Sequence, residues 1–342
     1  MRVVDKIQEV SPKILVIGDI MLDRFIFGNV RRISPEAPVP VVRSIQEKYS
    51  LGGCGNVLRN LINLGVQASI ISFVGKDQAG EKIKQHLKKK GISTKHIIQS
   101  ESNRTTEKMR IVAEGQQVVR VDWDASNLND QNLNKVLKQV LKKITNVDGV
   151  IISDYNKGIC TELVIKNIIS KAKELQIPVF VDPKGKRWNK YYDATIITPN
   201  LKEAEEAIGR DLITDKDVEI AGKEICKNLN LEACLITRGP NGMSYIGEDA
   251  IFHVCSEAKE IYDVSGAGDT VIASLTAGIL VGFDPETVIR FANKAAGIVV
   301  GHIGTTAITI PELLKTVYHL WNLQKNLGYC PKTIIQIGIQ LW

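Results

Sequence analysis

The chain has 342 residues, of which 44% are hydrophobic and 24% are charged, and its formal net charge is +6. This composition is typical of a globular protein with one large or two smaller α/β domains, and no apolar run approaches the ~20 residues that a membrane span needs. The positive charge suits anionic small-molecule substrates but is too diffuse to indicate nucleic-acid binding, and residues 1–13 lack the apolar core of a signal peptide.

Short β-branched runs alternate with helical patterns along the chain. We expect strands at 14–18, 70–75, 149–153, 178–182, 195–198 and 233–237. Helices are expected at 56–64, 79–90, 130–143, 162–175, 201–208, 218–228, 267–281 and 285–300. Strands that alternate with helices predict an α/β fold with a mostly parallel sheet covered on both faces.

Two segments, 24–48 and 105–123, break this alternation. The first is strand-like with three prolines, and the second holds two β-like runs joined around Gly115. Neither contains a crossover helix, so we expect a small antiparallel excursion from the main sheet that serves as a lid. Residues 1–315 would then form one domain. Residues 316–342 contain no Asp or Glu and form an extension to which the sequence assigns no role.

Polar residues stand where five of the expected strands end. They are Asp19, Asp154, and the groups at 182–184, 198–200 and 237–239. Each could be a helix cap or a turn residue. Open α/β sheets bind ligands in the crevice outside the carboxyl ends of their strands, so five such ends together indicate a ligand site.

The segment 263–270 reads Asp-Val-Ser-Gly-Ala-Gly-Asp-Thr and opens an expected helix. The small residues Gly266, Ala267 and Gly268 let backbone amides approach a ligand, and a helix N-terminus favours a phosphate. A carboxylate beside such an anion cradle makes sense if Asp269 takes a proton from a hydroxyl that attacks the phosphate. The pattern therefore indicates a phosphotransferase. The alternative is an ordinary capped helix whose glycines allow close packing.

Motifs for other chemistries are missing from the sequence. There is no Gly-x-Gly-x-x-Gly, and the spacing of Gly75 and Gly80 is followed by Glu81 where a phosphate-binding loop needs lysine. The protein-kinase signature is also missing. The six cysteines form no Cys-x-x-Cys pair and the histidines no His-x-x-x-His, which argues for reduced thiols in a cytoplasmic protein and against zinc.

Five motifs occur in a fixed order: Gly18-Asp19 with Asp23, Gly-Gly-Cys-Gly-Asn at 52–56, Asn200-x-x-Glu203, Thr237-Arg-Gly239 with Gly242, and the 263–270 segment. Over about residues 13–315 the chain thereby resembles the ribokinase-like (PfkB) sugar kinases. Within that family, segments 18–24, 32–41, 153–158, 182–185 and 291–297 resemble the heptose-7-phosphate kinases of lipopolysaccharide biosynthesis. Cys54 and Gly55 depart from the two alanines expected there.

The resemblance implies a three-layer α/β fold with a β-strand lid and an ATP- and Mg²⁺-dependent kinase, with a monovalent cation as a further candidate. The acceptor would be O1 of D-glycero-β-D-manno-heptose 7-phosphate, and the product would be the 1,7-bisphosphate. Asp269 would be the base, and the amides of Gly266, Ala267 and Gly268 would stabilise the transferring phosphoryl group.

Further roles follow for residues that match the family motifs or lie near them. The sugar would be bound by Asp19, Asp23, Gly52, Gly53, Asn56 and Asp154. Cations for its phosphate would come from Lys108, Arg110, Arg120, Lys157 and Lys184, although such residues are more often solvated surface charges. The nucleotide would contact Asn200, Glu203, Thr237, Gly239, Gly242, Asp263 and Asn293. Glu203 would also support Mg²⁺ through water, or it could simply cap a helix with Asn200.

Other functions stay open from the residues alone. Within the family, the acceptor could be a fructose phosphate, ribose or a nucleoside. A non-catalytic sensor on the same fold would need no base, so Asp269 argues against it. Related bifunctional proteins carry a nucleotidyltransferase domain with His-x-Gly-His, which is missing here, so we expect a kinase-only form or a kinase fragment. We expect a homodimer with no nucleic-acid or membrane partner.

Overall fold

The computed structural model describes residues 2–125, 128–258 and 260–315. Its main sheet has the strand order β13-β12-β11-β10-β9-β8-β1-β4-β5. The bounds of these strands in chain order are β1 Lys13–Gly18, β4 Gln67–Gly75, β5 Ile97–Ser100, β8 Gly149–Ser153, β9 Val179–Asp182, β10 Ile196–Ile197, β11 Ala233–Thr237, β12 Met243–Gly247 and β13 Ile251–Val254. Neighbours from β11 to β5 pair in parallel, and β12 and β13 add an antiparallel edge. The predicted mostly parallel sheet is confirmed.

Helices cover both faces of this sheet. The bounds are α1 Arg2–Val10, α2 Cys54–Leu64, α3 Gln78–Lys89, α4 Asp130–Lys143, α5 Glu162–Glu174, α6 Leu201–Ile208, α7 Asp215–Leu229, α8 Ala267–Leu280 and α9 Pro285–Val299. Short 3-10 turns occur at η1 Ile144–Asn146, η2 Asn189–Tyr191 and η3 Gly239–Asn241. None of the helices in these described ranges is long and apolar enough to cross a membrane.

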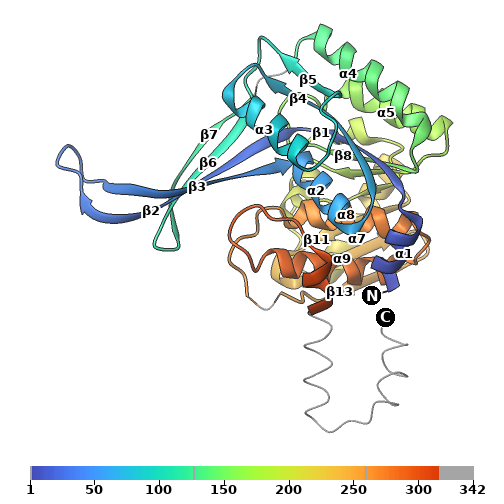
Figure 1. Cartoon of the computed structure of the whole chain (residues 1–342). Helices are drawn as coiled ribbons and strands as arrows, with labels where there is room; N and C mark the ends of the chain where they lie inside the picture. Colours follow the sequence, from blue (N-terminus) through green and yellow to red (C-terminus); the bar gives the residue numbers. More distant parts are fainter. Residues whose placement is uncertain (1, 126–127, 259, 316–342) are drawn as a thin grey trace.

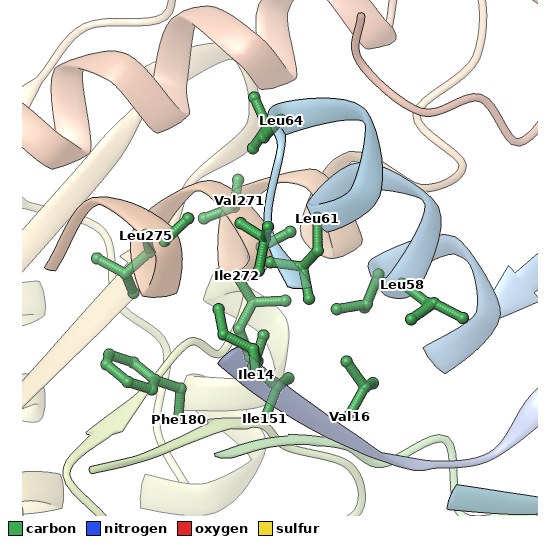
Figure 2. Close-up of a cluster of buried hydrophobic side chains, with 14 of the residues drawn as sticks. Ile14, Val16, Leu58, Leu61, Leu64, Ile151, Phe180, Val271, Ile272 and Leu275 are labelled. Atoms are coloured by element: carbon green, nitrogen blue, oxygen red, sulfur yellow. The ribbon is translucent and has the colours of Figure 1, made fainter. Parts of the chain in front are cut away.

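The central strand β1 shows how two cores arise from one sequence. Successive side chains of a strand point to opposite faces. Ile14 and Val16 join a core with α1, α2, α3, α8 and α9, whereas Leu15 and Ile17 join one with α4, α5, α6 and α7. Figure 2 shows Ile14 and Val16 beneath leucines of α2 and beside α8. The three-layer α/β fold is therefore confirmed.

A second sheet projects from the three-layer body (Figure 1). Its strand order is β3-β2-β6-β7, with bounds β2 Ile20–Ile33, β3 Pro40–Gly53, β6 Thr106–Ala113 and β7 Gln116–Trp123. We refer to these four strands as the lid sheet. Hairpins β2-β3 and β6-β7 are antiparallel, but β2 pairs with β6 in parallel. The expectation of a purely antiparallel excursion was wrong here, because β2 and β6 both leave the carboxyl edge of a parallel sheet and so run the same way.

Candidate active site

A cleft of about 680 Å³ opens at the carboxyl edge of the main sheet. Many of the sequence-predicted site residues line it: Asp154, Lys184, Asn200, Glu203, Thr237, Gly239, Gly242, Gly266, Ala267, Gly268 and Asn293. This volume is within the ~300–1,000 Å³ typical of small-molecule sites. The fold thus gathers strand ends that are far apart in the sequence around one cavity.

The start of α8 forms one wall of this cleft. Gly266 adopts φ 87°, a left-handed conformation that favours glycine, and the helix begins at the next residue. A Cβ built on Gly268 meets no atom within 4 Å, so the space beside the first helical turn is open. The first amides of a helix have no partner within the helix. This opening can therefore receive an anion such as a phosphate.

Asp269, in the first turn of α8, is only 2% exposed. The Asn56 side-chain amide donates to its Oδ2 at 3.0 Å, and the Tyr155 hydroxyl donates to its Oδ1 at 2.8 Å. Burial raises the pKa of Asp269 to about 6, and the two hydrogen bonds oppose that rise. The carboxylate is therefore largely ionised at neutral pH and is a stronger proton acceptor than an ordinary aspartate.

Glycines around this site leave room for the polar side chains. A Cβ at Gly266 would lie 2.6 Å from the Asn56 amide nitrogen that binds Asp269. At Gly52 a Cβ would lie 2.3 Å from Asp23 Oδ2. Gly53 has φ 58° and precedes α2, which carries Asn56 on its first turn. The 52–53 pair therefore allows close packing of β3 against Asp23 and fixes the start of α2.

Asp23 lies on β2 with both oxygens engaged. Arg110 donates to Oδ1 at 2.6 Å, and the Thr305 hydroxyl donates to Oδ2 at 2.8 Å. Arg110 is 7% exposed, and its guanidinium also lies over the Phe25 ring at 5.1 Å. Because Asp23 already pairs with the Arg110 guanidinium, Arg110 is a weaker candidate for binding the substrate phosphate than the sequence indicated.

The remaining lid cations share a sheet face with Arg110. Arg120 is directly opposite Arg110 on β7 and pairs with Asp122 at 3.0 Å. Lys108 lies two residues from Arg110 on β6, and its ammonium is 5.7 Å from the centre of the Tyr155 ring. Lys108 forms no ion pair with any described residue, and burial lowers its pKa. Lys108 is therefore the lid cation that is best placed to bind an incoming anion.

Asp19 holds a loop instead of facing open space. Its carboxylate accepts the backbone N–H groups of Tyr155, Lys157 and Ile159 at 2.9, 3.0 and 3.2 Å. Burial, together with the nearby Asp154, raises the pKa of Asp19 to about 6. Because both oxygens bind this loop, the geometry assigns Asp19 to positioning Tyr155, which differs from the direct sugar contact expected from the sequence.

Asp154 and Lys157 also have partners within the protein. Lys190 and the Tyr191 hydroxyl bind Asp154 Oδ2 at 2.5 and 2.7 Å, and Asp154 is 1% exposed. Lys157 pairs with Asp124 at 2.7 Å. These contacts tie the end of β8 to η2 and stabilise the floor of the cleft.

Glu203 and Asn200 form a capping box at the start of α6. The Asn200 side chain accepts the Glu203 N–H, and Glu203 Oε2 accepts the Asn200 N–H. Lys184 binds the other oxygen, Oε1, at 2.6 Å. The capping interpretation is thus confirmed. Direct metal ligation would have to displace Lys184, whereas a water-mediated contact would not.

Asp182, at the end of β9, has a different environment. It lines the cleft, and its carboxylate accepts no hydrogen bond from a described residue. Burial raises its pKa well above the usual range, and the negative charges of Glu203 and Asp269 add to this effect. Carboxylates that converge in this way favour a bound cation between them.

The far wall of the cleft is formed by residues expected at the nucleotide. Gly239 and Gly242 have φ 56° and 79°, and Gly242 N–H donates to Gly239 O at 3.0 Å, closing a tight turn after Thr237. Asn293 donates to Cys255 O at 2.8 Å. The exposed apolar side chains of Ile261 and Val264 line the same wall. An exposed apolar surface of this kind suits a flat aromatic ring such as the base of a nucleotide.

The Asp263 carboxylate binds backbone N–H groups on two sides of the site. Its Oδ1 accepts Ser265 N–H at 2.9 Å and its Oδ2 accepts Gly304 N–H at 3.1 Å. It therefore connects the segment before α8 with the loop that carries Thr305, and so helps fix Gly266.

Sequence reasoning did not assign roles to four site residues. Tyr155 and Asp182 stand inside motifs that it quoted, so only their orientation was missing. Arg59 donates to Asn56 Oδ1 and to Thr305 O, both at 3.3 Å. Thr305 follows α9 and has no motif signal. Its contact with Asp23 depends on the tertiary fold.

The comparisons with known proteins identify the family. The model of the pfkB family of carbohydrate kinases matches residues 11–313. The chain belongs to this family. It is accordingly a sugar kinase, a phosphotransferase with an alcohol acceptor.

Several curated relatives and solved structures are similar to the chain. The bifunctional protein HldE of Rhodospirillum rubrum is 40% identical over 90% of this chain, and HldE of Wolinella succinogenes is 42% identical over 90%. The chain spans 62% and 65% of their lengths. Phosphofructokinase-2 from Escherichia coli in complex with potassium has a TM-score of 0.77 at 21% identity, covering 90% of this chain and 99% of that one. Arabidopsis thaliana ribokinase complexed with ribose and ATP has a TM-score of 0.68 at 19% identity, covering 88% and 95%. These two structures support the fold.

Proposed function

We propose that the protein is an ATP-dependent kinase that phosphorylates O1 of D-glycero-β-D-manno-heptose 7-phosphate, giving the 1,7-bisphosphate. The observation that carries the proposal is the buried Asp269 carboxylate in the first turn of α8, directly after Gly266, Ala267 and Gly268, which line a cleft of sufficient size. The similarity to HldE proteins supports the choice of a heptose phosphate over other sugars. We place the reaction in ADP-heptose and lipopolysaccharide core biosynthesis.

The residues around Asp269 suit the transfer of one phosphoryl group. The sugar hydroxyl would give its proton to the carboxylate as its oxygen forms a bond to the γ-phosphorus of ATP. The bond from that phosphorus to the ADP oxygen breaks, and ADP leaves. Asn56 and Tyr155 hold the carboxylate in place through their hydrogen bonds. The amides of Gly266, Ala267 and Gly268 would stabilise the negative charge of the transferring group. The Ala267 N–H would first have to leave Val264 O, to which it donates at 3.2 Å.

Magnesium fits the acidic part of the cleft. Asp182 has no hydrogen-bond donor among the described residues, and it is close enough to Glu203 and Asp269 for their charges to raise its pKa. We propose that Asp182 and, through water, Glu203 support the ion. When bound, Mg²⁺ would neutralise charge on the nucleotide phosphates. A monovalent cation remains a proposal, which activity measured in potassium against a bulky organic cation would test.

The lid sheet supplies the proposed site for the phosphate of the sugar. Lys108 forms no ion pair with a described residue, and its ammonium lies 5.7 Å from the ring of Tyr155, whose hydroxyl binds Asp269. We propose Lys108 as the main cation, with a smaller part for Arg110 and Arg120 on the same sheet face, because Asp23 and Asp122 already pair with them. Closure of this sheet would exclude water, which competes with the sugar hydroxyl.

A panel assay tests the proposed function. ADP release is measured with heptose 7-phosphate, fructose 6-phosphate, ribose and a nucleoside, with Asp269→Asn as the control for contaminating kinases. The proposal expects the highest kcat/KM for heptose 7-phosphate and, in the control, at most about 1% of the wild-type activity. A higher kcat/KM for another acceptor would identify that acceptor as the substrate and leave the assignment as a kinase unchanged. Binding without turnover of any acceptor would favour the sensor. We further propose a cytoplasmic homodimer, which sedimentation of the purified protein tests.

A further inference from the structure

A second concave surface lies at the edge of the main sheet opposite the active-site cleft. It has a volume of about 520 Å³ and is bounded by the amino ends of β1 and β4, the residues before β5 and the carboxyl end of α4. Figure 1 shows β4, β5 and α4 close together at the top of the view. The length of a strand, roughly 15–20 Å, separates this surface from the cleft. We call it the basic pocket.

Its name comes from the side chains that line it: Lys13, Lys95, His96, Lys142 and Lys143, together with the amide of Gln139. None of the four lysines forms an ion pair with a described residue, in contrast to Lys76 or Lys173, which each pair with a carboxylate. Asp148 also lies at this edge, where its carboxylate accepts the backbone N–H of Lys13 at 2.7 Å. Within the part of the chain that the structure describes, the pocket's lysines therefore keep ammonium groups that no carboxylate pairs with.

His96 reports the strength of that charge. Its Nδ1 is 3.1 Å from Gln139 Oε1, and its ring is partly buried in the pocket wall. Burial lowers the pKa of His96, the hydrogen bond with Gln139 opposes this change, and the positive charges of Lys143, Lys95 and Lys142 lower the pKa further. Lysines from two places, α4 and the segment before β5, thus raise the positive potential at the His96 ring. An anion placed among them would remove this repulsion.

We propose that the basic pocket binds a small phosphorylated anion at a site separate from the active-site cleft. Its volume suits a metabolite-sized ligand, and a phosphate group favours several converging cationic and N–H donors. The charges are gathered in a discrete cavity instead of a long stripe, which distinguishes this site from a nucleic-acid surface. The inference uses none of the residues of the proposed kinase reaction and does not depend on it.

The chain provides an internal control for the test. His86 on α3 also has a pKa lowered by burial and by neighbouring positive charges, among them Lys89 and Lys82, but it does not line the basic pocket. Simple screening by a polyvalent anion would act on both histidines, whereas binding in the pocket would act on His96 alone.

The experiment is an NMR titration of the assigned histidine side chains in the full chain at constant ionic strength. The probes are inorganic pyrophosphate and glucose 6-phosphate, added separately. At saturation with at least one probe, we expect the pKa of His96 to rise by about one pH unit, which corresponds to about tenfold tighter binding to the protonated form. His86 should not change. An unchanged His96 with both probes, or equal changes at both histidines, overturns the proposal.

Two double variants complete the test. The double variant Lys142→Ala/Lys143→Ala removes the positive charges of the last two residues of α4. The double variant Lys88→Ala/Lys89→Ala removes those of the last two residues of α3. The first should weaken binding of the probe at His96 by about tenfold or more, as expected when charged hydrogen bonds are lost, and the second should leave it unchanged. Kinase activity without the probe should be that of the wild type in both. Equal weakening by the two double variants would identify nonspecific electrostatics and contradict a site.

Discussion

The hydroxyl of Tyr155 donates a 2.8 Å hydrogen bond to the carboxylate of Asp269, while the backbone N–H of the same tyrosine is held by Asp19. One residue thus connects the end of β1 with the start of α8. Because the hydrogen bond favours the ionised carboxylate, Tyr155 limits the rise of the Asp269 pKa that burial causes. The pKa of Asp269, the proposed base, therefore depends on a residue outside its own helix, and this dependence can be measured.

Tyr155→Phe should therefore move the acid limb of the pH profile. Loss of the donor raises the pKa of Asp269, so activity falls away at a higher pH as the solution is acidified. A hydrogen bond to a charged group contributes about 1.5 kcal/mol, which corresponds to about one pH unit. The measurement is kcat/KM from pH 5 to pH 9. Tyr192→Phe, a change at a residue that is 51% exposed, is the matched control and should leave the profile in place. Identical acid limbs in all three proteins would contradict the prediction.

Asp269→Asn should lower kcat by at least about 10²-fold with little change in ATP affinity, since it removes the proposed base but keeps the size of the side chain. Steady-state kinetics and equilibrium nucleotide binding measure the two effects. A kcat near that of the wild type would eliminate Asp269 as the base.

The same variant should also be more stable than the wild type at high pH. Folding raises the Asp269 pKa from 3.8 to about 6, so the ionised form destabilises the native state above pH 6 by at most about 3 kcal/mol. Asparagine avoids that cost but cannot accept from both Asn56 and Tyr155, so we expect a gain of about 1–2 kcal/mol. Chemical denaturation at pH 8 and pH 4 measures it. The gain should shrink at pH 4, where the native carboxyl is protonated. A gain of equal size at both pH values would refute the linkage.

Glu203→Gln should raise the Mg²⁺ concentration needed for half-maximal activity while leaving the KM for the sugar unchanged. The substitution removes a negative charge near Asp182 and the ion pair with Lys184, but its amide oxygen can still accept the Asn200 N–H. Magnesium titrations of activity check the first effect and thermal unfolding checks the cap. An unaltered Mg²⁺ requirement with a lower Tm would leave capping as the only role of Glu203.

Lys108→Met and Arg110→Met should have different consequences. Lys108→Met should raise the KM for the phosphorylated sugar by about tenfold or more without a comparable effect on ATP, because a charge-assisted contact to phosphate is lost. Arg110→Met leaves the buried Asp23 without its ion-pair partner, so it should chiefly lower stability. KM values for both substrates and denaturation curves of both variants separate these outcomes. If Arg110→Met alone raised the sugar KM in a stably folded protein, the phosphate would be assigned to Arg110.

The sequence predicted the fold well where local patterns decide it. The strand at 149–153 was placed with its observed bounds, and the glycines and Asp269 at the start of α8 carry their signal within a few residues. The start of α7 was placed too late because the capping box of Thr214 and Asp217 was not noticed. The helix at Arg2–Val10 and the β12-β13 hairpin were missed because each is short and depends on packing against the main body.

Contacts in the site were harder to predict than elements. Arg110 was expected at the substrate phosphate because a cation on a lid has no visible partner in a one-dimensional sequence, yet Asp23, 87 residues away, neutralises it. Likewise, Asp19 was expected to face the sugar, but the loop after β8 folds over it and uses its oxygens. Both outcomes follow from burial, which forces a charged group to find a partner.

The lid sheet joins the main body without intervening loops on one side. Only Asp19 separates β1 from β2, and β3 ends at Gly53 where α2 begins at Cys54. A movement of β3 would therefore pass directly to the first turn of α2, which carries Asn56, the donor to the Asp269 carboxylate. Any swing of the lid sheet would reach the carboxylate of Asp269 through three residues of covalent chain. Closure of the lid sheet on the sugar, as proposed, would thus alter the hydrogen bond to Asp269, and the proposed base would be least reactive toward ATP when no sugar is bound.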